Sequence, residues 1–100
     1  MHRLKPQDVK NILNKNGSIR LIDVREEWEN KIARIQNSEL MPLSNFKETS
    51  KKLNKDNWLI IYCHHGIRSA NACYYLEALG FENLINLEGG IDAWSRQVDN

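Results

Sequence analysis

Hydrophobic positions along the chain alternate between helical spacing and short continuous runs. In the segment PQDVKNILNKNG, Val9, Ile12 and Leu13 are spaced so that they share one face of a helix. Pro6 suits the first turn of that helix, where no N–H is needed, and Gly17 suits a left-handed residue at its end. The pattern therefore predicts a helix that opens at Pro6 and closes at Gly17.

Four short segments have the composition of β-strands. SIRLIDVR is rich in β-branched residues and predicts a strand that ends near Arg25, and NLINLEGG contains a last short strand. SELMPL is compatible with a further strand, which Pro42 would stop because proline cannot donate to a ladder. WLIIYC has a continuous apolar run before Cys63, which is typical of a strand buried on both faces.

Two more segments have helical patterns. SNFKETSKKLNK predicts a polar helix capped by Ser44, with Phe46 and Leu53 on one side. IRSANACYYLEALG predicts a longer helix that ends at Gly80. The apolar stripe of this longer helix comprises Ala72, Tyr75, Leu76 and Leu79. Helices alternating with strands around an apolar central strand predict an α/β fold with a mostly parallel sheet.

Composition narrows the class of protein. A chain of 100 residues without repeats or linkers is expected to form one domain over residues 1–100. Its 41% hydrophobic and 27% charged residues are those of an ordinary globular protein. A formal net charge of +1 gives no electrostatic support for binding nucleic acid or an anionic membrane.

Membrane and redox features also set expectations. No apolar run approaches the roughly 20 residues that a bilayer span requires, and the N-terminal segment lacks the apolar core of a secretory signal. Cys63 and Cys73 are too few for a disulfide scaffold, and free thiols suit a reducing compartment. We therefore expect a cytoplasmic protein without a cofactor and without a nucleic-acid or membrane partner. Its oligomeric state is left open.

The segment CHHGIRS joins the apolar strand to the following helix and has the residues of an anion-binding loop. Ligands of open parallel sheets bind beyond the carboxyl ends of strands, where residues 23–25 and 88–90 are also expected. A short strand-to-helix loop directs N–H groups to one point, and the helix dipole adds positive potential. Gly66 provides backbone freedom and Arg68 a permanent charge. At that focus Cys63 should be stabilised as a nucleophilic thiolate.

This loop closely resembles the active-site loop of rhodanese-like sulfurtransferase domains. LIDVRE at Leu21 to Glu26 and LEGGIDAW at Leu87 to Trp94 are similar to the first and C-terminal signatures of that family, in the same order. The resemblance implies a five-stranded parallel sheet with helices on both faces. It also implies an enzyme that moves sulfane sulfur through a persulfide on Cys63. The implied donor is thiosulfate or a protein persulfide, and the implied acceptor is a thiol or cyanide.

The resemblance assigns roles within the loop. Cys63 attacks the donor sulfur, while Arg68 completes the loop and steadies the anion. Loop N–H groups hold the negatively charged outer sulfur at little reorganisation cost. These substrate-binding positions are His64, His65, Gly66, Ile67 and Ser69. Whether the His64 and His65 rings shape the approach to the loop or transfer protons stays open, and a zinc site made from them with Cys63 lacks a visible fourth ligand.

Residues outside the loop are interpreted structurally. Asp23 and Arg25 share a face of their strand and are expected to support neighbouring loops, because a carboxylate beside the thiol would disfavour the thiolate. Cys73 follows Cys63 by about 15 Å of helix, too far for a disulfide, and is expected in the core. Trp94 is expected to anchor the C-terminal helix.

Other functions remain open at this point. Cysteine phosphatases and some arsenate reductases share this fold, but they have five residues between cysteine and arginine, and this chain has four and no acid in the loop. Non-catalytic rhodanese-like modules that serve in interaction or regulation usually lack the cysteine, which this chain keeps. A thioredoxin-type redox protein would need a second cysteine at two-residue spacing.

The chain departs from the family pattern at two places. The segment ARIQNS, Ala33 to Ser38, keeps only the isoleucine of the family's Gly-His-Ile-Pro-Gly-Ala stretch, so its backbone is expected to differ. Ile67 stands where family members that handle thiosulfate well carry an extra lysine or arginine. Because a small dianion gains less electrostatic help here, we expect the physiological donor to be a protein persulfide or a less charged sulfur compound.

Overall fold

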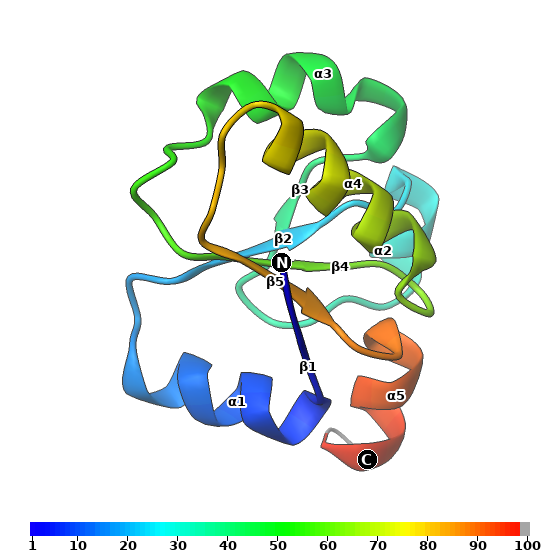
Figure 1. Cartoon of the computed structure of the whole chain (residues 1–100). Helices are drawn as coiled ribbons and strands as arrows, with labels where there is room; N and C mark the ends of the chain where they lie inside the picture. Colours follow the sequence, from blue (N-terminus) through cyan, green and yellow to red (C-terminus); the bar gives the residue numbers. More distant parts are fainter. Residues whose placement is uncertain (99–100) are drawn as a thin grey trace.

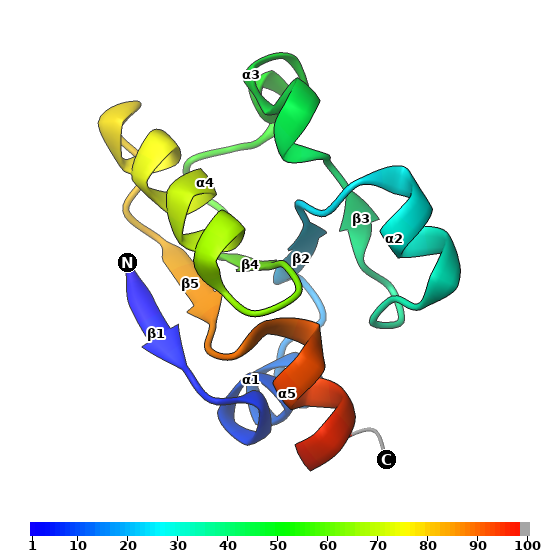
Figure 2. The ribbon, with the colours of Figure 1, turned by 90° about the vertical axis from the view of Figure 1, so that its right-hand side faces the viewer.

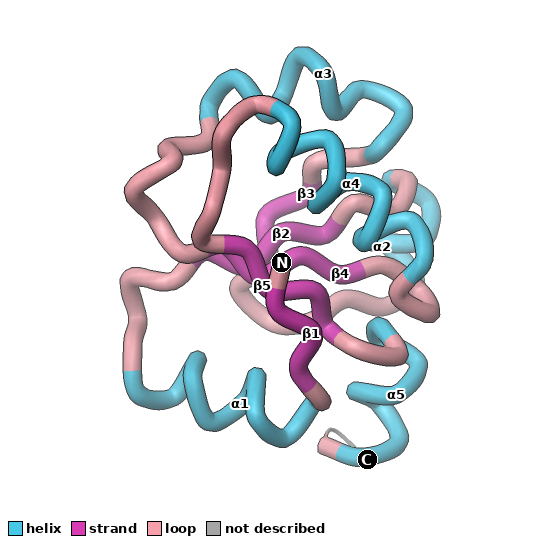
Figure 3. Tube along the Cα trace, viewed as in Figure 1, coloured by secondary structure: helices cyan, strands magenta, loops and turns pink. Residues whose placement is uncertain are grey.

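Five parallel strands form one sheet with helices on both faces, which confirms the expected α/β fold (Figures 1 and 3). The computed structural model describes residues 1–98. The spatial order of the strands is β1, β5, β4, β2, β3. Their bounds are β1 His2–Leu4, β2 Arg20–Asp23, β3 Glu39–Leu40, β4 Leu59–Tyr62 and β5 Leu84–Leu87.

The helices form two layers. Helices α1 and α5 cover one face of the sheet, and α3 and α4 cover the other (Figures 1 and 2). Among residues 1–98, no helix combines the length and the apolar character needed to cross a membrane. The bounds are α1 Pro6–Lys15, α2 Glu27–Ile32, α3 Phe46–Thr49, α4 Ile67–Ala78 and α5 Gly90–Gln97, with the 3-10 turns η1 Leu43–Asn45 and η2 Ser50–Lys52 on either side of α3.

Side chains of β4 alternate between two hydrophobic cores, one on each face of the sheet. Leu59, Ile61 and Cys63 belong to the core under α3 and α4. Ile60 and Tyr62 belong to the core under α1 and α5. This alternation follows the period of two that a strand imposes. All of β4 is buried, as its apolar run predicts for a strand in the middle of a parallel sheet.

The carboxyl ends of the central strands lie along one edge of the sheet, because the strands are parallel and in register. Asp23 pairs with Tyr62, and Ile61 pairs with Asn86. Strand β2 ends at Asp23, earlier than the expected end near Arg25, and β3 ends before Pro42 as predicted. The segments that follow β2, β4 and β5 therefore meet at this edge.

The end of α1 corrects one prediction. The helix ends at Lys15, and Asn16 is extended, with φ −139°. Gly17 is not among the residues with positive φ in the described part of the chain, so it is not the left-handed cap that was expected. Asn16 turns the chain instead, because its Oδ1 accepts hydrogen bonds from the N–H and hydroxyl of Ser18 at 3.0 and 2.6 Å.

Helix α4 ends at Ala78 and Gly80 stops it as predicted, but the helix buries a different stripe. Gly80 has φ +96°, and the N–H groups of Gly80 and Phe81 donate to the carbonyls of Glu77 and Leu76, which is a Schellman motif. The predicted stripe is wrong at Tyr75 and Leu79, which are 37% and 46% exposed. The buried residues are Ser69, Ala72, Cys73 and Leu76, which have helical spacing and include Cys73 as expected.

The polar helix predicted after Ser44 is broken into η1, α3 and η2. Ser44 lies within η1 and does not cap a helix; its hydroxyl donates to Glu26 Oε1 at 2.7 Å. Phe46 and Leu53 are both buried, so the predicted apolar side is confirmed.

Candidate active site

Cys63 lies directly after β4, with its sulfur beneath the first turn of α4. Its Sγ accepts hydrogen bonds from the N–H groups of Gly66 and Ser69 at 3.1 and 3.3 Å. The first N–H groups of a helix lack partners within the helix and carry its positive dipole end. Cys63 is only 1% exposed. A buried sulfur is thus surrounded by backbone donors that suit a negative charge.

Gly66 is the backbone residue that lets α4 begin so close to Cys63. It has φ +106° and precedes the first residue of the helix. L side chains rarely adopt this conformation, so glycine is required by the turn itself. The same residue lies against the turn that follows β5, because a Cβ placed on Gly66 would be 3.5 Å from the Gly89 nitrogen.

The first turn of α5 holds the other side of the Cys63 backbone. Ile91 N–H donates to the Cys63 carbonyl at 2.9 Å, and Asp92 N–H donates to the His64 carbonyl at 3.1 Å. Gly90 directly precedes these two residues with φ +62°, and a Cβ there would be 2.3 Å from the His64 carbonyl oxygen. The glycine pair after β5 therefore allows α5 to pack directly on the Cys63 loop.

Asn86 in the middle of β5 connects two parts of the loop. The Ser69 hydroxyl donates to Asn86 Oδ1, and Asn86 Nδ2 donates to the Gly66 carbonyl at 3.1 Å. Ser69 Oγ also lies 3.3 Å from the Cys63 sulfur, and either atom can be the donor of this contact. The side chain of Asn86 is buried and orients both residues whose N–H groups bind the sulfur.

Four other backbone N–H groups of the loop have no hydrogen-bond partner among residues 1–98. Within residues 1–98, the backbone N–H groups of His64, His65, Ile67 and Arg68 have no hydrogen-bond acceptor. His64, His65 and Ile67 are exposed. The expected cluster of loop donors thus consists of two N–H groups that donate to the Cys63 sulfur and four that have no partner among residues 1–98.

Arg68 is placed against α2, where its guanidinium forms a bidentate pair with Glu29. Nη1 and Nη2 lie 2.7 and 2.8 Å from the two carboxylate oxygens. The hydrogen bond from Arg68 lowers the pKa of Glu29 from an ordinary 4.5 to about 2. Glu29 also accepts the N–H of Glu26 in a capping box that starts α2. Arg68 therefore fixes the loop to α2 through its ion pair.

Asp23 and Arg25 occupy the supporting position expected from their spacing. Arg25 donates from Nε and Nη2 to the Asp23 carboxylate at 3.0 and 2.8 Å, and both side chains are buried. Arg25 Nη2 also donates to the Ala33 carbonyl at 2.7 Å. The Tyr62 hydroxyl accepts the Ile35 N–H at 3.2 Å. The segment from Ala33 to Ser38 is thus held by side chains from β2 and β4.

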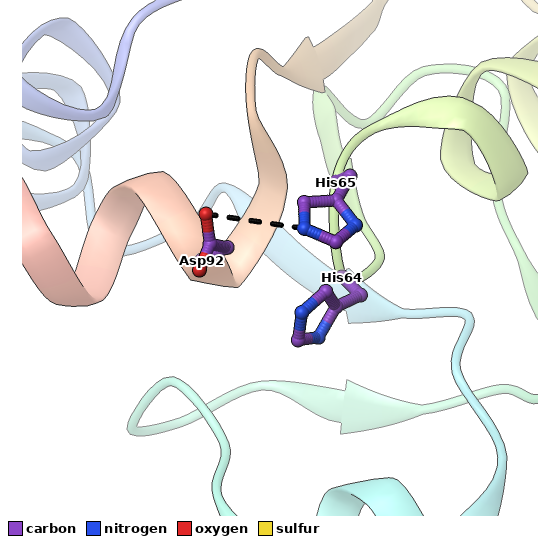
Figure 4. A group of neighbouring side chains, drawn as sticks. All are labelled: His64, His65 and Asp92. Carbon is purple, nitrogen blue, oxygen red and sulfur yellow. Dashed lines mark ion pairs between the residues drawn. The ribbon is translucent and has the colours of Figure 1, made fainter.

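The other residues singled out from the sequence lie either in the two cores or at the surface beside α5. Trp94 is buried in the core between α5 and the sheet. Cys73 is fully buried in the other core, and burial raises the pKa of its thiol to about 12. His64 and His65 are exposed beside α5, with their ring centroids 4.1 Å apart (Figure 4). His65 Nε2 lies 3.9 Å from Asp92 Oδ2.

Three residues of the site were missed from the sequence. Asn86 is the single polar residue in the apolar strand LINL, which is a usable signal because buried amides need partners. Glu29 lies on α2, and the capping-box spacing of Glu26 and Glu29 is a sequence signal for the start of that helix. Asp92 gives no local signal, since its position beside the histidines depends on the packing of α5.

Comparisons with known proteins agree with this geometry. A family model described as a rhodanese-like domain matches residues 5–97. The putative sulfurtransferase YtwF of Bacillus subtilis is 34% identical over 90 residues, which cover 90% of this chain and 86% of that protein. A rhodanese-like domain protein from Staphylococcus aureus has a crystal structure with TM-score 0.87 and 33% identity, covering 94% of this chain and 91% of that chain.

A longer relative contains a similar region. The probable adenylyltransferase/sulfurtransferase MoeZ of Mycobacterium tuberculosis is 35% identical over 97 residues, or 95% of this chain. These residues cover 25% of that protein, so the chain spans about a quarter of the length of this relative.

The contact between Gly90 and the loop predicts a large effect of one methyl group. Gly90→Ala should lower the free energy of unfolding by at least about 1–3 kcal/mol, because alanine is strained at φ +62° and its Cβ would meet His64. Urea unfolding of wild type and variant measures this difference in the free energy of unfolding. The control is Gly17→Ala, where no atom lies within 4 Å, and it should be neutral or stabilising by about 0.4–1 kcal/mol. Equal midpoints for both variants would contradict the described packing.

The Arg68–Glu29 pair predicts a pH-dependent contribution to stability. The folded pKa of Glu29 is depressed to about 2, so its contribution is present above its ordinary value of 4.5 and is lost as pH falls toward 2. Arg68 is 37% exposed, so the contribution is modest. In urea unfolding over this pH range, wild type should lose its advantage over Glu29→Gln on acidification. Glu27→Gln, which removes the exposed pair of Glu27 with Lys31, should change the free energy of unfolding little at any pH. An advantage of wild type over Glu29→Gln that grew at low pH would contradict the lowered pKa of Glu29.

Proposed function

Because the chain belongs to the rhodanese-like domain family, we propose that it is a sulfurtransferase that carries a sulfane sulfur on Cys63. The observation that supports this most directly is the pair of N–H groups, from Gly66 and Ser69, on a buried cysteine sulfur. Backbone donors aimed at one sulfur stabilise a thiolate and cost no rearrangement when charge develops.

In the first half-reaction, the Cys63 thiolate attacks the outer sulfur of a donor such as thiosulfate. A new S–S bond forms to Cys63, and the S–S bond of the donor breaks with its electron pair leaving on sulfite. The product is a persulfide anion on Cys63, so one negative charge stays in the loop before and after the step. Shielding of the buried sulfur from water limits side reactions of this intermediate.

In the second half-reaction, a nucleophilic acceptor such as a thiolate or cyanide attacks the outer sulfur. The persulfide bond breaks, its electron pair returns to Cys63 as the thiolate, and the outer sulfur leaves on the acceptor. Gly66 and Ser69 would hold the inner sulfur throughout. The unpartnered N–H groups of His64, His65, Ile67 and Arg68 would bind the outer sulfur.

The residues around the loop act as positioning residues in this proposal. Asn86 fixes Gly66 and Ser69. Glu29 fixes the guanidinium of Arg68 through a bidentate ion pair. Ile67 is exposed and uncharged, so residue 67 itself gives an incoming anion no electrostatic help. We therefore propose a protein persulfide or a weakly charged sulfur compound as the preferred donor over thiosulfate.

One observation favours a second candidate, a non-catalytic interaction module. Cys63 is 1% exposed, and a thiol that never reaches solvent could not exchange sulfur. The two candidates differ in whether the folded protein accepts sulfur from a donor. A persulfide assay on the native protein separates them.

Persulfide formation at Cys63 is the direct test. Reduced protein incubated with thiosulfate or a low-molecular-weight persulfide and then desalted should gain the mass of one sulfur atom, reversed by cyanide with release of thiocyanate. Cys63→Ser should abolish the gain. Cys73→Ser is the matched control and should keep it, because the buried Cys73 thiol has its pKa raised to about 12. Folded protein that gains no sulfur from either donor would favour the interaction module.

The identity of residue 67 predicts the response to thiosulfate. Ile67→Lys should raise kcat/KM for thiosulfate by roughly 5- to 30-fold, since a cation near the loop contributes about 1–2 kcal/mol of attraction to the dianion. The gain should fall at high salt. Ile67→Gln is the control, with a polar side chain and no charge. Rapid turnover of wild type at low thiosulfate concentrations, or equal gains in both variants, would overturn the donor preference.

A further inference from the structure

We propose that His64, His65 and Asp92 form a surface site for a divalent cation of the zinc class, beside the Cys63 loop. The three side chains project into one shared space between the loop and α5 (Figure 4). One ligand atom from each lies within 4.8 Å of the others. The sulfur-transfer mechanism uses none of these side chains, so the proposal holds whether or not Cys63 carries sulfur.

The backbone that carries these ligands is fixed before a metal binds. Asp92 N–H donates to the His64 carbonyl at 3.1 Å, and Ile91 N–H donates to the Cys63 carbonyl at 2.9 Å. These bonds hold the first turn of α5 against the loop. Metal binding would therefore require only side-chain rotation.

The rotation needed is small. Zinc lies about 2.0–2.2 Å from nitrogen and oxygen ligands, so tetrahedral ligand atoms approach one another to roughly 3.4 Å. His65 Nε2 and Asp92 Oδ2 are already 3.9 Å apart. Both histidines are exposed, so their side chains have room to change rotamer, and Asp92 is half-buried. The remaining adjustment lies within the reach of these side chains.

The donor set determines the class of metal. Two imidazole nitrogens and one carboxylate suit Zn²⁺ and the neighbouring ions Co²⁺, Ni²⁺ and Cu²⁺, whereas Mg²⁺ and Ca²⁺ prefer oxygen ligands alone. Three protein ligands leave a coordination position open for water or an anion. This set differs from the zinc site considered from the sequence, because Cys63 is buried and its sulfur binds the N–H groups of Gly66 and Ser69.

One charge opposes the site and provides a sharp test. Arg96 Nη2 lies 3.0 Å from Asp92 Oδ2, the same oxygen that faces His65. A cation at the site must displace this guanidinium or bind beside it. Removal of the Arg96 side chain should therefore strengthen metal binding, while removal of any of the three ligands should weaken it.

Calorimetric titration of untagged protein with Zn²⁺ tests the proposal, in a Cys63→Ser background that removes competition by the thiol. His64→Ala, His65→Ala and Asp92→Asn should each weaken Zn²⁺ binding by at least about tenfold. Loss of a residue that hydrogen-bonds a metal ligand costs roughly 10- to 100-fold in metal affinity, and loss of the ligand itself should cost no less. Arg96→Ala should tighten Zn²⁺ binding. His2→Ala is the control, because His2 is the first residue of β1, where it pairs with Ile85. The proposed site lies instead at the carboxyl ends of the strands. Circular dichroism verifies that each variant folds.

Two results would overturn the site. The first is a single-site affinity that is unchanged by all three ligand substitutions. The second is binding that disappears in Cys63→Ser alone, together with a sulfur-to-metal charge-transfer absorption when wild type is titrated with Co²⁺, since the thiol would then be the ligand. Weak d–d absorption without a sulfur band, retained in Cys63→Ser, supports the histidine–aspartate site.

Discussion

The convergence of two backbone N–H groups on the Cys63 sulfur is the interaction on which the site depends. It exists because β4 is buried on both faces and delivers Cys63 into the core under α4, while Gly66 lets α4 begin within one turn. Burial removes water from the sulfur, and the donors of Gly66 and Ser69 replace it. The polar environment of this sulfur is therefore a consequence of how one strand is joined to one helix.

The surrounding elements keep that junction in place through polar contacts. Asn86 from β5 fixes the loop from below, Glu29 from α2 fixes Arg68, and α5 binds the Cys63 and His64 carbonyls. Within residues 1–98, every buried side-chain nitrogen and oxygen has a hydrogen-bond partner. Such a satisfied network holds a single arrangement, because any displaced group would be left buried without a partner.

Much of the fold follows from the sequence, because the apolar patterns of β4, β5, α1 and α4 mark where these elements lie. The failures have physical causes. Strand β1 is short and mostly exposed, so it carries no apolar signal, and it is a strand only because β5 offers an edge. Helix α2 buries no residue and depends on its capping box and the pair with Arg68. The Cys63 loop is one continuous segment and could be recognised in the sequence, whereas Asn86 and Asp92 reach the loop only through tertiary packing.

Amide chemical shifts of the loop test the central claim most directly. As the thiol of Cys63 ionises in a pH titration followed by ¹H–¹⁵N NMR, the amide protons of Gly66 and Ser69 should shift together and further than those of neighbouring residues, because both donate to the sulfur. Cys63→Ser should remove this response and leave any shifts caused by His64 and His65. Gly66 and Ser69 amides that do not respond, or that respond equally in Cys63→Ser, would contradict the account.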